Sequence, residues 1–197
     1  GDRVIAGTRF GGQAELVTVP AEQALPLPDR LSFEQGAAFP VNYATAYAAL
    51  IIMGSLREGD RVLIHAAAGG VGISATQIAK STGAEIFGTA SASKHDAIRA
   101  QGVKHAIDYR SQDPAKEIRR ITGQKKPLDL VMDAIGGNSL RKSFGLLRAG
   151  GRGDRVRPGP HVCHPGRPRR RRRVGGRRRP GAGRADLGHA HRRRPCD

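Results

Sequence analysis

The chain lacks tryptophan and is poor in other aromatic residues and in cysteine, and this composition limits the kinds of site it can hold. Its 197 residues include only five Phe and three Tyr. Both cysteines, Cys163 and Cys196, lie in the last quarter, so residues 1–151 hold no disulfide and no cysteine-based metal site. No apolar run reaches the ~20 residues that span a bilayer, and no charged-then-apolar leader is present. We therefore expect a cytoplasmic protein with no transmembrane segment.

Positive charge dominates the whole chain but is unevenly placed. The formal net charge is +17. Residues 152–197 hold 16 Arg against three acidic residues, whereas residues 1–151 hold 18 basic against 14 acidic residues. The first three quarters therefore have the composition of an ordinary globular protein, and the excess charge belongs to the tail.

The tail, residues 152–197, has no apolar periodicity and contains no Ile, Met, Phe, Tyr or Trp. We expect it to be disordered, because it cannot bury enough apolar surface to offset its ordering entropy. The interpretation we favour is a shifted reading frame, and a natural extension is a second. A third is a nucleic-acid-binding arm built on 169–173 and 177–179, although it offers no aromatic side chain for base stacking. We predict no metal site at its scattered His and Cys residues, and no specific nucleic-acid partner.

Strands and helices alternate between residues 60 and 151. The pattern predicts strands over 61–65, 85–89, 105–108 and 128–133, and helices over 70–82, 94–101, 114–122 and 138–147. Such alternation is typical of an α/β fold, a Rossmann-type parallel sheet with helices on both faces. We count about four βα units, an incomplete set, because GDRVRPGP stands where an apolar fifth strand is due after residue 151.

The region before residue 60 is less regular. The patterns predict strands over 3–7 and 14–20, joined by a Gly11-Gly12 turn. A helix capped by Ser32 is expected to end at Phe39-Pro40, and a second helix to cover 45–53.

The segment VLIHAAAGGVG, residues 62–72, predicts a phosphate-binding turn. Ala67, Gly69 and Gly72 have the spacing of the G-x-G-x-x-G motif between a strand and a helix. Glycine there allows close approach of the backbone to a pyrophosphate, whose charge the helix N-terminus favours. The alternative is a tight strand-to-helix turn without a ligand.

The end of the next strand indicates which dinucleotide is preferred. A carboxylate that would hold a ribose 2′-hydroxyl is missing there, and the segment TASASK offers hydroxyls and a cation instead. These groups suit a 2′-phosphate, so we predict NADPH, bound by Ser91, Ser93 and Lys94. The alternative is that Ser93 only caps the following helix and Lys94 is a solvated charge.

The strings HAAAGGVG, GTASASKH, GVKHAIDYR and DLVMDAIGG together resemble the zinc-independent quinone oxidoreductases of the medium-chain dehydrogenase/reductase superfamily. VNYATAYAAL and GTASASKH look most like the synaptic vesicle membrane protein (vesicle amine transport) homologues in it. The resemblance implies a remnant of a GroES-like β domain over 1–30, an NADP-binding Rossmann domain over 31–151, and the tail over 152–197. It also implies NADPH-linked reduction of quinones or α,β-unsaturated carbonyls, and a homodimer for the intact family.

The family pattern also transfers to individual positions. It implies cofactor contacts at Thr45, Ala68, Gly69, Gly70, Val71, Gly72, Ser91, Ser93, Lys94 and Tyr109, and cleft positions at Asn42, Tyr43 and Tyr47. Packing at a strand end is an equal alternative for Tyr109, and helix packing is one for Tyr47. FPVNYATAY has no Cys or His where zinc-dependent relatives place a ligand, so no metal is expected. No side chain stands out as a proton donor, and the catalytic residue stays unassigned.

The sequence therefore predicts an NADPH-dependent oxidoreductase acting on a small quinone or enone. Two alternatives from other classes remain open: a basic protein that binds nucleic acid through its tail, and an NADPH-binding module without catalysis.

Overall fold

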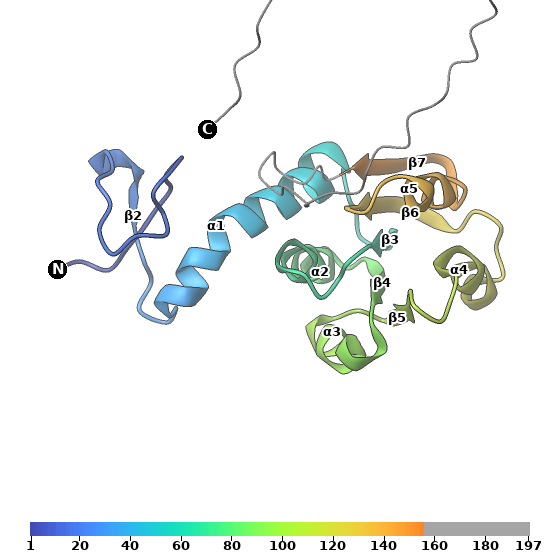
Figure 1. Ribbon diagram of the computed structural model, residues 1–197. Coiled ribbons are helices and arrows are strands. Elements are labelled where there is room, and N and C mark those ends of the chain that lie inside the picture. Colours follow the sequence, from blue (N-terminus) through green and yellow to red (C-terminus); the bar gives the residue numbers. More distant parts are fainter. Residues whose placement is uncertain (156–197) are drawn as a thin grey trace, which may run out of the picture. The chain divides into compact units, whose positions relative to one another are not determined.

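The main sheet contains five parallel strands in the order β5–β4–β3–β6–β7 (Figure 1). The computed structural model describes residues 1–155 of the chain. The strands are β3 (Arg61–Ile64), β4 (Glu85–Ala90), β5 (His105–Asp108), β6 (Leu128–Asp133) and β7 (Leu147–Arg155). The predicted α/β class and the four βα units are confirmed, and all four strands predicted after residue 60 are present.

Helices cover both faces of this sheet, as the alternating pattern predicts. They are α2 (Gly70–Thr82), α3 (His95–Gln101), α4 (Pro114–Thr122) and α5 (Asn138–Phe144), and a short 3-10 turn, η3 (Ala92–Lys94), precedes α3. Figure 1 shows α2 and α3 on one side of the strands and α4 and α5 on the other. Asp113 caps α4 by accepting hydrogen bonds from the backbone of Ala115 and Lys116.

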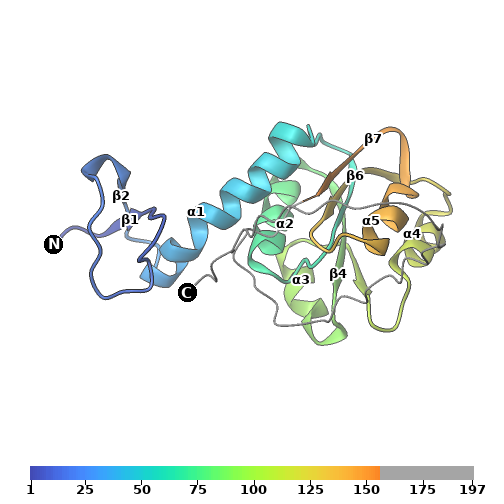
Figure 2. The ribbon, with the colours of Figure 1, turned by 45° about the horizontal axis from the view of Figure 1, so that its top comes forward.

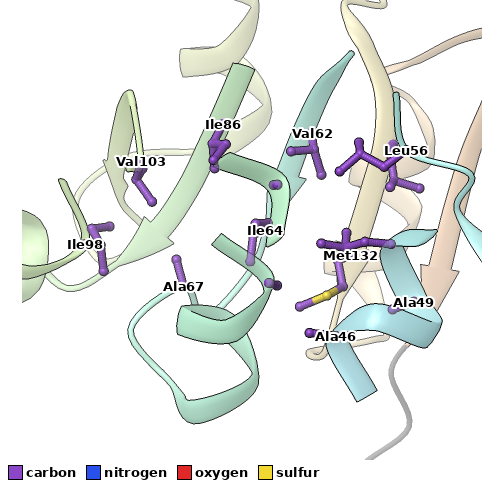
Figure 3. Packing of buried hydrophobic residues seen from close by; sticks show 14 of the residues in the cluster. Ala46, Ala49, Leu56, Val62, Ile64, Ala67, Ile86, Ile98, Val103 and Met132 are labelled. Carbon is purple, nitrogen blue, oxygen red and sulfur yellow. The ribbon is translucent and has the colours of Figure 1, made fainter. Parts of the chain in front are cut away.

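The core is divided between the two faces of the sheet because successive strand residues point to opposite sides. Val62 and Ile64 pack with Ile86 and Met132 on the face covered by α2, and Figure 3 shows these side chains converging. Leu63 belongs instead to the second cluster, which includes Phe87, Ile107, Ile118 and Val131. A fully buried side chain of this kind contributes about 1.5–3 kcal/mol, so both clusters hold the site's scaffold in place.

The fifth strand corrects the expectation that the sheet stops at its fourth. The predicted helix over 138–147 ends at Phe144, and β7 begins at Leu147 and pairs with β6 as far as Arg155. Residues 152–155 therefore lie in the sheet rather than in the tail. The sequence pattern did not predict this strand, because ion pairs rather than apolar side chains hold it in the sheet. Arg148 pairs with Asp129, and Arg152 pairs with Asp60. The tail interpretations now concern residues 156–197, which lie outside the described residues.

The long helix α1 (Phe33–Tyr47) runs straight through Pro40 and corrects the expected break there. Pro40 removes only one backbone hydrogen bond, and a capping box between Ser32 and Gln35 fixes the start. The helix continues as a π-helix, η2 (Ala48–Met53). Figure 2 shows α1 beside α2, and Ala46, Ala49 and Leu50 at its end join the sheet's core.

The continuous helix Phe33–Met53 also bears on the predicted absence of an apolar segment. It has 21 residues and a mean hydropathy of 1.3, so within residues 1–155 it alone is long and apolar enough to cross a membrane. The prediction that no apolar run approaches this length is wrong by that measure, because α1 and η2 form one helix. The test is weak for a single helix, because core helices of folded domains also pass it.

A two-stranded sheet precedes α1 and differs from the expected hairpin. The strands β1 (Val4–Ala6) and β2 (Ala24–Pro26) are antiparallel, with Ile5 opposite Leu25, and a 3-10 turn, η1 (Ala21–Gln23), precedes β2. The predicted strand over 14–20 is absent, because its apolar residues find no surface to pack on. Leu16 there is 91% exposed.

Candidate functional site

The turn between β3 and α2 has the geometry of a phosphate cradle. A Cβ added at Gly72 would lie 2.3 Å from the carbonyl oxygen of Ala66, so no other residue fits. Gly69 is the N-cap of α2, and because glycine has no side chain it leaves the free N–H groups of the first helical turn open. Ala66 adopts a left-handed conformation, with φ 53°. The turn therefore presents helix donors at a point where the backbone is closely packed, as an anion site requires.

Gly70 and Val71 contribute in different ways. A Cβ at Gly70 would lie 2.7 Å from Nδ2 of Asn42, so glycine lets α1 approach the first turn of α2. The side chain of Val71 packs against the core cluster, which leaves only its backbone for a ligand.

A cavity of about 230 Å³ lies between this turn and the carboxyl end of β4. Predicted residues from distant parts of the chain meet there: Ala68, Gly69, Ser91, Lys94 and Tyr109. Thr89 and Ala90, which open the predicted TASASK segment, also line the cavity, and so does Ala66, to which the sequence analysis assigns no role. Among the described residues that line this cavity, Lys94 is the only charged one.

Ser93 lies at the edge of this cavity rather than in its lining. Its hydroxyl is 3.3 Å from that of Ser91, and it sits inside η3 instead of capping α3 through its side chain. Tyr109 is half exposed, with the guanidinium of Arg110 6.0 Å from its ring centre. The nearby Asp108 is occupied within its own loop, since its carboxylate accepts from Arg110 N and Ser111 Oγ, and these bonds lower its pKa.

A second cavity, of about 280 Å³, lies between α1 and α2 and brings together Asn42, Tyr43 and Gly70. Tyr43 stacks on Phe39, with ring centres 4.4 Å apart, and its hydroxyl donates to Gln77. Asn42 Nδ2 donates to the carbonyl of Ala38 at 2.8 Å.

Thr45 and Tyr47 are not brought to either cavity in the part of the chain that the structure describes. The hydroxyl of Thr45 donates to the carbonyl of Val41 at 2.7 Å, and Tyr47 is 52% exposed. Their predicted contacts stay predictions, because nothing in residues 1–155 places a ligand beside them.

The loop after β6 is a part of the site that the sequence analysis quoted but did not assign. The strand order reverses between β3 and β6, and ligands of open α/β sheets bind at such a point. Asp133 Oδ1 accepts from the backbone of Ile135 and Gly136, both at 2.7 Å. Burial raises the pKa of Asp133, but these two bonds lower it, and the net pKa lies below its ordinary value. A charged carboxylate thus shapes this loop.

No group of three or more His, Cys, Asp or Glu side chains within residues 1–155 is arranged to hold a metal ion. Cys163, Cys196 and the tail histidines lie outside the described residues, so the expected absence of zinc stays a prediction.

The chain is similar in sequence and fold to known proteins. A family model described as a zinc-binding dehydrogenase matches residues 70–153. The synaptic vesicle membrane protein VAT-1 homolog of Danio rerio is 46% identical over 153 residues, which are 77% of this chain and 31% of that protein. The human VAT-1 homolog is 45% identical over 153 residues, which are 77% of this chain and 38% of that protein. This chain thus spans about a third of the length of the curated relatives it matches.

A solved structure gives the same result for the fold. The quinone oxidoreductase from Thermus thermophilus, whose structures include a complex with NADPH, superposes with a TM-score of 0.70 at 39% identity. The match covers 82% of this chain and 52% of that one. These similarities confirm the resemblance that the sequence motifs indicate. The chain belongs to the medium-chain dehydrogenase/reductase superfamily of oxidoreductases, and the VAT-1 homologues are among its relatives.

Proposed function

We propose that the chain supplies the NADPH-binding half of an oxidoreductase that reduces quinones or α,β-unsaturated carbonyls without zinc. The observation that carries the proposal is the cavity at the end of β4, where Lys94 and the hydroxyl of Ser91 gather and no carboxylate joins the lining. A 2′-phosphate is a dianion that accepts hydrogen bonds, so a lysine and hydroxyls fit it, whereas a 2′-hydroxyl would favour an acidic partner.

The chain's own residues divide the work of holding this cofactor. Lys94 and Ser91 hold the 2′-phosphate, Tyr109 covers the adenosine end, and the first N–H groups of α2 hold the pyrophosphate. Asn42, which abuts Gly70, lines the second cavity. The nicotinamide supplies the hydride, and the protein contributes orientation and exclusion of water.

A titration of the full chain with NADPH and with NADH tests the cofactor preference, with the Lys94→Ala variant beside the wild type. Loss of one charge-assisted contact to a phosphate weakens NADPH binding by about ten-fold or more and leaves NADH binding within about two-fold. The matched control is Lys116→Ala, an exposed lysine on α4 across the sheet. Equal affinity of the wild type for both cofactors, or unchanged NADPH affinity in Lys94→Ala, would contradict the proposal.

A second candidate, an NADPH-binding module without turnover, follows from the coverage of the relatives. The chain spans 31% of the Danio rerio relative, so more than two thirds of that protein lies outside the match. A quinone-reduction assay on the full chain separates the two functions. NADPH oxidation that depends on the quinone supports the reductase, and tight binding without oxidation supports the module.

The purified full chain can also be used to test the predicted homodimer. Light scattering after gel filtration gives the mass of the full chain, and a mass near 42 kDa, twice the 21.0 kDa of one chain, supports a dimer.

A further inference from the structure

Four polar side chains are buried together behind the phosphate turn. His65, Thr89, Asp133 and Ser143 are each at most 4% exposed. They come from the ends of β3, β4 and β6 and from α5, so the group joins both halves of the sheet. Burying polar groups costs free energy unless they hydrogen-bond, which makes their mutual arrangement informative.

The contacts of His65 determine where its proton sits. Nε2 lies 3.0 Å from Ser143 Oγ and 3.9 Å from Asp133 Oδ2, while Nδ1 lies 3.2 Å from Thr89 Oγ1. Asp133 Oδ2 is buried and has no hydrogen-bond partner among the described residues, so its negative charge favours a proton on Nε2. Burial lowers the pKa of His65, although Asp133 opposes this shift, and the ring is neutral. Nδ1 is therefore an acceptor.

This tautomer sets the direction of the next hydrogen bond. Because Nδ1 accepts, the Thr89 hydroxyl must donate to it. The Thr89 oxygen is then oriented to accept from the backbone N–H of Ala66, which lies 3.2 Å away. A second bond, from Ala67 N to the carbonyl of Thr89 at 2.9 Å, ties the same turn to β4.

The backbone of Ala66 needs the hydrogen bonds to Thr89 because its conformation is unfavourable. Its left-handed φ of 53° costs about 1 kcal/mol or more for a residue with a Cβ. Its carbonyl accepts from Gly69 N at 2.9 Å, and this bond closes the turn in front of α2. The conformation of Ala66 therefore fixes where the turn presents its anion-binding groups.

We propose that His65 is a positioning residue for the cofactor: acting through Thr89, it holds Ala66 and the phosphate turn in the binding conformation, and through Asp133 and Ser143 it links that turn to the loop after β6. The proposal rests on the NADPH-binding function given above. His65 touches no cofactor atom in this role, and its effect is on affinity through the shape of the turn.

Three substitutions of His65 separate positioning from simple packing, each measured in the full chain by NADPH fluorescence titration. His65→Leu removes both ring nitrogens. His65→Asn places an amide oxygen near the position of Nδ1 and keeps the acceptor for Thr89. His65→Gln reaches toward the position of Nε2 and Ser143 and loses that acceptor. The matched control is His105→Leu, because His105 also sits on a strand, stacked on Phe87 and bonded to Glu85 at the opposite end of the sheet.

We expect His65→Leu to weaken NADPH binding by about ten-fold, and His65→Asn to restore it to within about three-fold of the wild type. His65→Gln should bind about five-fold more weakly than His65→Asn, and His105→Leu should stay within about two-fold of the wild type. The rescue by Asn is the readout that loss of packing cannot produce, because Asn is smaller than either Leu or His.

Each other outcome has a definite meaning. Affinity in His65→Leu equal to that of His105→Leu, or no rescue by Asn, overturns the positioning role. If His65→Leu fails to fold, the comparison of Asn with Gln decides alone, and equal affinities there overturn the proposal. Failure of the wild-type chain to bind NADPH would instead remove the proposed function, so the two failures are distinguishable.

Discussion

Arg152 Nη2 lies 2.9 Å from Asp60 Oδ2 and ties the edge strand β7 to the loop that precedes β3. A second nitrogen of the same guanidinium, Nη1, donates to the carbonyl of Ser55 at 2.9 Å. The ion pair is largely buried, with the side chain of Asp60 11% exposed. One arginine thus holds a strand that has few apolar residues of its own.

Arg152→Ala is therefore expected to destabilise residues 1–155 by about 1–3 kcal/mol, because the buried Asp60 carboxylate loses its cationic partner and keeps only the bond from Arg57 N. Urea unfolding followed by circular dichroism measures the change. The control is Arg99→Ala, which removes an exposed pair with Asp96 and should cost less than about 0.5 kcal/mol. Equal losses in the two variants would show that Arg152 is no more than a surface charge.

Gly72→Ala tests the closely packed turn. A Cβ at this position would lie 2.3 Å from Ala66 O and 2.8 Å from two backbone atoms of Ala67. Because backbone must move to admit it, we expect a loss of about 2 kcal/mol or more and an NADPH affinity too weak to measure. Gly7→Ala is the control, since nothing lies within 4 Å of a Cβ at Gly7. A Gly72→Ala protein with unchanged thermal stability would contradict this account of the turn.

Glu85 predicts how stability responds to acid. Its carboxylate accepts from Arg61 Nε, Lys104 Nζ and His105 Nε2, and the pKa of Glu85 falls from 4.5 to about 2, chiefly through the bond to Lys104 and next through that to His105. A lowered pKa in the folded state stabilises it above pH 4.5, and the contribution is lost as the pH falls toward 2.

We therefore expect the free energy of unfolding of the wild type to exceed that of Glu85→Gln by about 1–2 kcal/mol at pH 7. This value is discounted because the site is partly exposed to solvent. The gap should close between pH 4.5 and pH 2 in urea titrations of both proteins. A gap that is independent of pH would mean that the carboxylate's charge contributes nothing.

The strands that the sequence predicted best lie inside the sheet and are buried. Leu128–Asp133, for example, is buried along its whole length, and glycines such as Gly123 mark where the helices end. The edge strand Leu147–Arg155 escaped prediction because its side chains are fixed by ion pairs, which have no period. The helix through Pro40 escaped because tertiary packing outweighs one lost hydrogen bond.

The site divides in a similar way. Gly69, Ser91 and Lys94 belong to local motifs, and the structure brings them to one cavity as expected. His65 and Ser143 are 78 residues apart and meet only in the fold. A polar residue at the end of a strand is ambiguous in sequence, because it can be a ligand, a solvated side chain or part of a buried network. Only the three-dimensional neighbours distinguish these cases.

Asp133 offers the last test, because its charge shapes the loop after β6. Asp133→Asn keeps an acceptor for Ile135 N and Gly136 N but removes its charge, and charge-assisted bonds are about twice as strong as neutral ones. We expect a loss of about 1–2 kcal/mol at pH 7 by urea unfolding. Because the pKa of Asp133 is lowered, this deficit should persist at pH 5 and shrink as the pH falls below 3.8.

The control for this variant is Asp96→Asn, an exposed carboxylate on α3 that pairs with Arg99. Its change should stay below about 0.5 kcal/mol at every pH, since exposed pairs are screened by solvent. If Asp133→Asn were as stable as this control at pH 7, the carboxylate would not be what holds Ile135 and Gly136. The Asp133→Asn variant also bears on His65. Its amide can donate toward His65 Nε2 and would then favour the tautomer with the proton on Nδ1.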